Sequence, residues 1–289
     1  MRAVLLGTAA GGGVPQWNCA CPGCRGARAG RHPARAQDCL AISADGASWY
    51  LVNASPDIRT QLLGCPALAP GPGARETPLR GVLLTDGELD HTTGLFQLKE
   101  AGGLTVHAPE PVLAALPART VLEPYARWDW RIAGSGELGG LRVDVLPVSG
   151  KRPKYAADAP GTWVVAYRFT DPATGGRLVY APCLAGWPFG FEEFCAGADV
   201  VLLDGSFHGS AEMSGATGGD VGDPAQRAMG HLPMAGPGGS LRKPRPPGAR
   251  LLYTHLNNTN PVLDESSPEH AAMRAAGAEL APEGAELVL

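Results

Sequence analysis

The chain has 289 residues, a formal net charge of −4, 40 glycines and 27 prolines. A chain of this length can bury a substantial core, and its hydrophobic share of 44% excludes a disordered protein. The slight acidity gives no reason to expect a nucleic-acid partner, and the lack of any run of about 18 apolar residues excludes a membrane helix. The apolar N-terminal stretch, residues 1–6, runs into glycines and is too short for a secretion signal.

The first predicted strand, residues 3–6, leads into a glycine-rich stretch at residues 7–13. Glycine allows the backbone to approach another group closely. A phosphate-binding loop is the alternative, but the Lys-Ser/Thr ending that such a loop requires is missing. We therefore expect a close backbone approach here.

Three cysteines follow the glycine-rich stretch in the pattern C-x-C-x2-C: Cys19, Cys21 and Cys24. Thiolates with this spacing can share one tetrahedral zinc ion, and such a closed site stabilises a loop without being catalytic. The chain has seven cysteines, an odd number with three bunched together, which favours metal ligands in a reducing cytoplasm over disulfides. The fourth zinc ligand stays open among His32, Cys39, Cys65, Asn258 and His270.

Four potential metal ligands lie in one short stretch after the predicted strand 81–84: Asp86, Glu88, Asp90 and His91. Crowded carboxylates raise one another's pKa unless a cation lies among them. Carboxylate oxygens with one imidazole suit Fe(II), Mn(II) or Zn(II). The alternative is a solvated acidic turn that caps the following helix.

Two pairs of strand-like runs, each separated by turn residues, predict two β-hairpins. Residues 38–43 and 48–53 flank Asp45-Gly46, and residues 163–169 and 177–181 flank the turn at residues 171–176. Residues 209–224 are rich in Gly, Ser and Asp, and we expect them to form a mobile loop that acts as a lid.

Polar residues also follow the later strands. A basic loop with Lys151, Arg152 and Lys154 comes after the strand predicted at residues 141–148, and it either meets an anionic substrate or is simply solvated. Two further apolar strands end at Asp204 and His255. Strand ends are where α/β folds place their chemistry, so this repetition favours a metal site.

This order of strand ends resembles the metallo-β-lactamase superfamily, whose metal loop reads H-x-H-x-D-H. The resemblance implies a four-layer αββα sandwich of the α/β class, here one domain over residues 1–289 with an N-terminal zinc-knuckle loop. More closely, the chain resembles the protein B family of pyrroloquinoline quinone (PQQ) biosynthesis. The matching stretches are residues 7–19, 53–59, 229–231 and 255–261.

The chain departs from the hydrolases of the superfamily at three histidine positions. Asp86 and Glu88 replace the first two histidines of the loop, and Ser149-Gly150-Lys151 stands where a third is expected. Losing three imidazoles weakens a dinuclear zinc site. Two imidazoles with carboxylates remain, as in mononuclear Fe(II) oxygenases, and these residues are Glu88, Asp90, His91, Asp204 and His255.

The family resemblance implies an iron-dependent hydroxylase, an oxidoreductase that acts with O2 on the tyrosine-derived part of a glutamate–tyrosine peptide precursor of PQQ. Iron, or else zinc or manganese, is expected to bind Asp90, His91 and His255, with Glu88 or Asp204 completing the shell and Asp86 nearby. His231 is expected to donate a proton or anchor the substrate. The substrate-binding residues are expected to be Lys151, Arg152, Lys154, Asn257 and Asn258.

Two other functions stay open. One is a metal-dependent hydrolase of the phosphodiesterase type, and the other is a non-catalytic carrier of PQQ or its precursor. We expect the protein to be cytoplasmic and to bind neither membranes nor nucleic acid. A homodimer is one assembly open to it.

Overall fold

The computed structural model describes residues 1–210, 212–218 and 222–289. Within these ranges the strands form two seven-stranded sheets. The first sheet contains, in spatial order, β14 (Glu286–Val288), β1 (Arg2–Gly7), β2 (Cys39–Ser43), β3 (Trp49–Val52), β4 (Leu79–Leu83), β5 (Thr105–Ala108) and β6 (Asp129–Ile132). The second contains β13 (Ala278–Leu280), β12 (Arg250–Thr254), β11 (Val200–Asp204), β10 (Arg177–Ala181), β9 (Val164–Thr170), β8 (Leu141–Ser149) and β7 (Gly136–Leu138).

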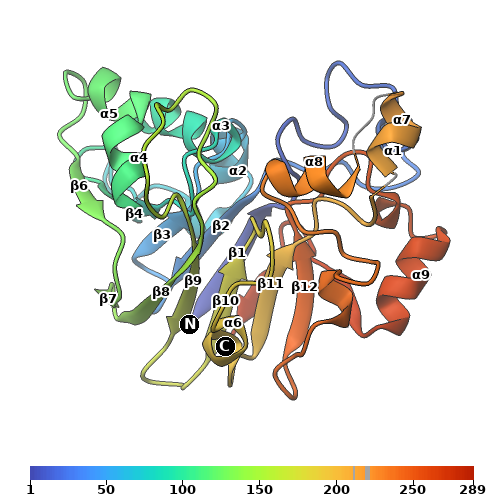
Figure 1. Ribbon diagram of the computed structural model, residues 1–289. Coiled ribbons are helices and arrows are strands. Elements are labelled where there is room, and N and C mark those ends of the chain that lie inside the picture. The colour runs from blue at the N-terminus through green and yellow to red at the C-terminus, as the bar shows by residue number, and fades with distance from the viewer. Residues whose placement is uncertain (211, 219–221) are drawn as a thin grey trace.

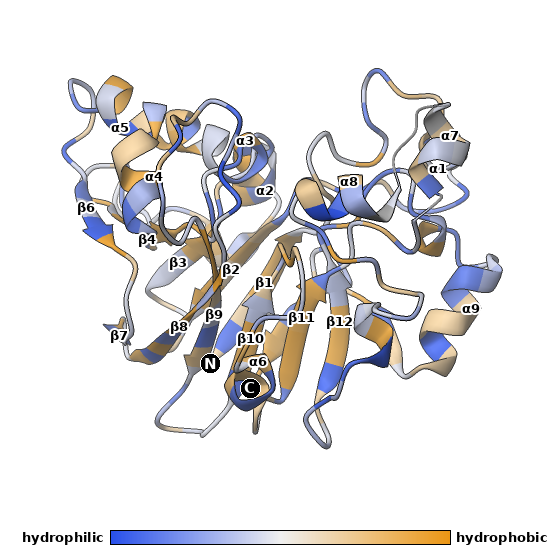
Figure 2. Cartoon of the chain, viewed as in Figure 1, coloured by the Kyte–Doolittle hydropathy of each residue, from blue (hydrophilic) through white to orange (hydrophobic). Residues whose placement is uncertain are grey.

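Successive side chains of a strand point to opposite faces, and both faces of each sheet are buried here. In β11, Val200 and Leu202 join the core between the two sheets, whereas Val201 and Leu203 join a second core on the outer face. Figure 2 shows β10 and β11 coloured mostly as hydrophobic, as expected for strands covered on both sides.

Helices cover the two outer faces, which completes the predicted αββα sandwich (Figure 1). The first sheet is covered by α2 (Ile58–Leu63), η2 (Thr93–Leu98), α4 (Glu110–Ala115) and α5 (Pro117–Leu122). The second is covered by α6 (Phe191–Cys195) and α9 (Pro268–Ala275). The remaining helices are α1 (Pro22–Arg28), η1 (Pro66–Leu68), α3 (Leu89–Thr92), α7 (Glu212–Thr217), α8 (Asp223–Ala228), η3 (Ser240–Arg242) and η4 (Pro261–Leu263).

Parallel pairing brings the ends of distant segments to one edge of the sandwich. Strand β4 pairs parallel with β3 and β5, and β11 pairs parallel with β10 and β12. The carboxyl ends of parallel strands lie at the same edge, so the segments that follow β4, β10, β11 and β12 gather there.

Both predicted hairpins are confirmed as antiparallel pairs, β2 with β3 and β9 with β10. The prediction of a loop over residues 209–224 is wrong at residues 212–217, which form α7, and at residues 223–224, where α8 begins; residues 211 and 219–221 are outside the described residues. Helix α8 has a proline in its first turn, a position at which the missing N–H costs nothing. In the described part of the chain, we find no helix with the length and apolar character needed to span a membrane.

Candidate metal centre and active-site cleft

A cleft of about 700 Å³ opens at the edge where the parallel strands end. Most of its lining comes from the loop after β4, the loop after β8 and residues 228–231, and His255 after β12 completes this side. Residues from the segments after β1, β3 and β10 also line it. The lining residues that matter for chemistry are Glu88, Asp90, His91, Lys151, His231 and His255.

The imidazole of His91 is fully buried and held by Asp86. Its Nδ1 lies 2.8 and 3.0 Å from the two carboxylate oxygens of Asp86, so Nδ1 carries the hydrogen that it donates. Its Nε2 is buried and has no hydrogen-bond partner in the described residues. A metal-binding histidine typically has one ring nitrogen held by a carboxylate and the other nitrogen free to bind the metal. His91 has this arrangement.

His255 follows β12 with a φ of 55°, a left-handed conformation that costs energy for a residue with a side chain. Its Nδ1 lies 2.8 Å from the Ser206 hydroxyl, and its Nε2 lies 3.3 Å from Oδ2 of Asp90. The ring centroids of His91 and His255 are 5.1 Å apart. The structure thus brings Asp90, His91 and His255 together.

Asp204 and His231 form the opposite side of the same cluster. Nδ1 of His231 lies 2.8 Å from Oδ2 of Asp204, which also accepts the backbone N–H of Leu184 at 2.8 Å. The His231 ring stacks on that of His255 with 5.0 Å between centroids. His231 therefore lies close enough to contribute to the centre directly or to act beside it.

Two overlapping sets of ligand atoms lie within 4.8 Å of one another in the described residues: Asp204, His231 and His255, and His91, Cys183 and His255. Cys183 was not among the metal ligands predicted from the sequence. The signal was present, because Cys183 follows β10, and β10 runs parallel to β11 and ends at the same edge.

Buried charges of opposite sign stabilise one another in the cluster. Burial alone raises the pKa of Asp86 and Asp90, but the charge of His91, together with the hydrogen bonds from His91 to Asp86 and from His255 to Asp90, outweighs it and both pKa values lie below their ordinary range. Burial alone lowers the pKa of His91, but the two carboxylates outweigh it and raise that pKa to about 10. Without metal, His91 is therefore protonated at neutral pH, and a metal ion must displace that proton.

Glu88 forms an ion pair with Lys151 of the loop after β8. The Tyr155 hydroxyl of the same loop donates a 2.7 Å hydrogen bond to the carbonyl oxygen of Gly87. The structure thus joins Glu88 to the basic loop, and among the described residues the Glu88 carboxylate is not part of a ligand set with an imidazole. Arg152 and Lys154 also line the cleft, and Arg152 pairs with the exposed Asp158 at 2.5 Å.

The three knuckle cysteines converge on Asn258. Its side-chain Nδ2 lies 3.2, 3.5 and 3.2 Å from the sulfurs of Cys19, Cys21 and Cys24. The amide of Asn257 instead bonds the Thr259 hydroxyl at 2.6 Å. Neither asparagine lines the cleft, so the structure does not bring these two predicted substrate-binding residues to it.

The glycine-rich stretch approaches the metal loop at Gly11. A Cβ at this position would lie 3.1 Å from Oδ2 of Asp90. Glycine therefore lets the backbone form one wall of the cleft beside a carboxylate of the cluster.

Comparison with known proteins is consistent with this geometry. A β-lactamase superfamily domain model matches residues 48–256. The chain is 41% identical to coenzyme PQQ synthesis protein B of Methylobacterium nodulans, with 100% of both chains covered. It is 36% identical to the crystal structure of Zn²⁺-bound PqqB from Methylobacterium extorquens, with a TM-score of 0.90 and 100% of both chains covered. A diphosphatase of the PhnP family shares the fold at 20% identity, with a TM-score of 0.66 over 99% of this chain and 97% of that one.

Proposed function

The chain belongs to the coenzyme PQQ synthesis protein B family within the β-lactamase superfamily, and from that premise we propose that it hydroxylates a PQQ precursor with iron(II) and O2. The substrate is the tyrosine-derived part of a peptide made from glutamate and tyrosine. The observation that carries the proposal is the buried, unpartnered Nε2 of His91 beside His255 and Asp90.

The donor set fits iron. Asp90, His91 and His255 offer one carboxylate and two imidazoles, the combination that non-haem iron(II) oxygenases use. Asp204 lies beside His255 and His231 and offers a further carboxylate. When bound, iron(II) supplies the one-electron chemistry that O2 needs for reaction with a phenol.

The pair of Glu88 and Lys151 supports a centre with one metal ion. Glu88 stands at a histidine position of the hydrolase loop, and Lys151 belongs to the segment 149–151 where a third histidine is expected. The positive charge of the Lys151 ammonium group neutralises the carboxylate of Glu88. A cation already built into the chain disfavours a second metal ion at the same place by charge repulsion.

The other side chains of the cleft orient a metal ligand, transfer a proton and bind the substrate. Asp86 fixes the ring of His91 so that Nε2 stays free. His231 moves a proton at Nε2 while Asp204 holds Nδ1. Lys151, Arg152 and Lys154 bind the carboxylates of the precursor through charge-assisted hydrogen bonds.

We further propose that Cys19, Cys21 and Cys24 hold a structural zinc ion and that Asn258 is its fourth ligand. A half-turn of the Asn258 amide exchanges its nitrogen for its oxygen, which then faces the sulfurs. Burial raises the pKa of the Cys21 thiol to about 11, so the metal ion must displace its proton.

The test compares iron-loaded, zinc-loaded and metal-free protein with a glutamate–tyrosine peptide precursor. We expect oxygen consumption coupled to substrate hydroxylation with iron alone, because zinc has no accessible redox change. Phosphodiester hydrolysis by the zinc form without oxygen consumption by the iron form would favour the hydrolase. Tight precursor binding with neither reaction would favour the carrier.

A further inference from the structure

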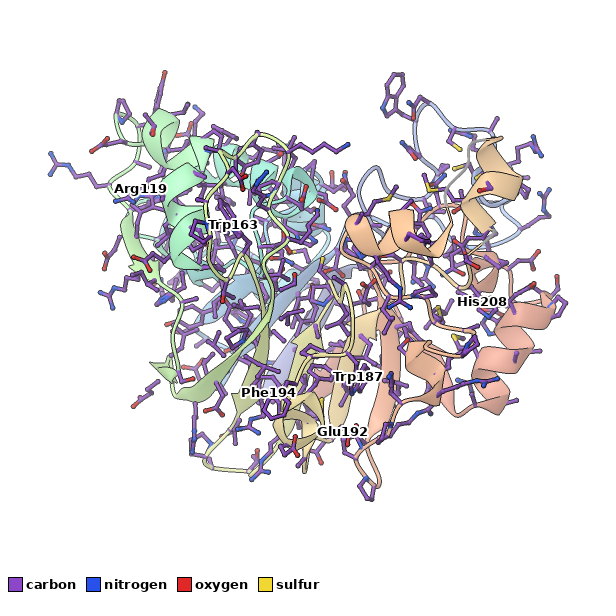
Figure 3. The ribbon with its side chains drawn as sticks, in the orientation of Figure 1. Arg119, Trp163, Trp187, Glu192, Phe194 and His208 are labelled. Atoms are coloured by element: carbon purple, nitrogen blue, oxygen red, sulfur yellow. The ribbon has the colours of Figure 1, made fainter. Side chains whose placement is uncertain are left out.

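A second cavity, of about 260 Å³, lies on the outer face of the second sheet. It is enclosed by α6, the preceding segment with Trp187, and residues 243–249, and we name it the α6 pocket. It shares no lining residue with the metal cleft. Figure 3 shows Trp187, Glu192 and Phe194 grouped around α6. The apolar walls are formed by Phe191, Cys195, Val201, Leu203 and Leu251.

The indole N–H of Trp187 is a hydrogen-bond donor without an acceptor in the described residues. Its Nε1 is buried and has no partner in the described residues. The ring packs edge-on against Phe191 with 4.8 Å between centroids. Buried tryptophan N–H groups usually find an acceptor, so an acceptor from outside the chain is the missing element.

The rim of the pocket carries an excess of positive charge. Lys243, Arg245 and Arg250 line it, against a single carboxylate from Glu192. Arg250 pairs with Glu279 at 3.4 Å, but Lys243 has no carboxylate partner among the described residues. Its Nζ lies 5.8 Å from the centroid of the Trp187 ring. The ammonium group of Lys243 therefore lies over the face of the same indole whose N–H has no acceptor.

We propose that the α6 pocket binds a small aromatic carboxylate. The volume is below the roughly 300–1,000 Å³ of drug-sized sites, so it admits one compact ring system. Aromatic rings pack well edge-on against Trp187 and Phe191. The carboxylate then accepts hydrogen bonds from Lys243 and the Trp187 indole, which satisfies both donors. This site is independent of the proposed oxygenase reaction.

The test is a titration of the full chain, in its zinc form, with naphthalene-2-carboxylate. The chain has six tryptophans, and the indole N–H resonance of Trp187 is the one lost from the ¹⁵N-labelled Trp187→Phe variant. We expect a saturable shift of that resonance towards the position typical of a hydrogen-bonded donor. The neutral amide of the same ring system should bind about tenfold more weakly, as expected when a charge-assisted hydrogen bond is lost.

Two matched charge reversals identify the cationic group. Lys243→Glu should weaken binding about tenfold or more, whereas Arg242→Glu, which makes the same charge change outside the pocket lining, should leave it nearly unchanged. Ala249→Trp fills the cavity and should abolish the shift. The proposal is overturned if no saturable shift occurs up to millimolar probe, or if the amide and the carboxylate bind equally and Lys243→Glu has no effect.

Discussion

Asp86 holds the imidazole of His91 through Nδ1 at 2.8 Å and leaves Nε2 buried without a partner in the described chain. Asp86 therefore acts on the metal centre through His91. A carboxylate in this place fixes the ring and makes its free nitrogen a stronger ligand.

Asp86→Asn should lower the affinity of the centre for iron by about 10–100-fold, the usual cost of losing such an outer partner. The amide keeps the size of the side chain but removes its charge. Competition with a coloured iron chelator measures the effect, and far-ultraviolet circular dichroism checks the fold. An unchanged affinity would show that Asp86 has no such role.

Metal binding should release about one proton at pH 7.5, because the pKa of His91 in the metal-free protein is about 10. Because this pKa is raised, the ion pairs of His91 with Asp86 and Asp90 stabilise the metal-free fold fully below pH 6.5. This contribution is lost as pH rises through 10. Apparent metal affinity should therefore rise with pH over this range. Calorimetry in buffers of different ionisation enthalpy counts the protons, and a count of zero would contradict the assignment.

His255→Ala should lose both iron and turnover, whereas His231→Ala should retain iron and turn over about 10²-fold more slowly. The reason is that Nε2 of His255 faces Asp90 within the proposed ligand set, while His231 lies on its far side against Asp204. Measuring both the iron content and the steady-state kinetics of each variant distinguishes the roles of the two histidines. Loss of iron from His231→Ala would make this histidine a ligand.

Lys151→Gln should raise KM for the precursor about tenfold and change kcat less, because its ammonium group lines the cleft and can meet a substrate carboxylate. Lys99→Gln is the matched control, since Lys99 also pairs with a glutamate but on the exposed surface. Equal KM values for the two variants would remove Lys151 from substrate binding.

Cys21→Ser should remove one zinc ion per chain and lower the free energy of unfolding by several kcal/mol, because metal binding energy is folding energy in closed thiolate sites. Cys65→Ser is the control, since Cys65 is also buried but lies in the core outside the first sheet. If Cys21→Ser kept its full zinc content and an unchanged Tm, the knuckle would not be a zinc site.

The strands and the edge at which they end were predictable from local sequence patterns, whereas the four-layer αββα arrangement was expected from the family resemblance. Apolar runs followed by Asp90-His91, by Asp204 and by His255 predicted strands whose ends share one edge, and parallel pairing brings those ends together in the structure. This prediction succeeds because side-chain periodicity and strand-end position are local properties that sequence patterns record directly.

The role of each side chain depends on contacts between segments that lie far apart in the sequence. The pairing of Glu88 with Lys151 joins residues 63 positions apart, and the contact of Asn258 with Cys19 joins residues 239 positions apart. The place of Cys183 beside His91 and His255 likewise depends on packing between separate strands. Such contacts are fixed by side-chain rotamers and by the approach of distant segments, and no local pattern in the sequence records either of them.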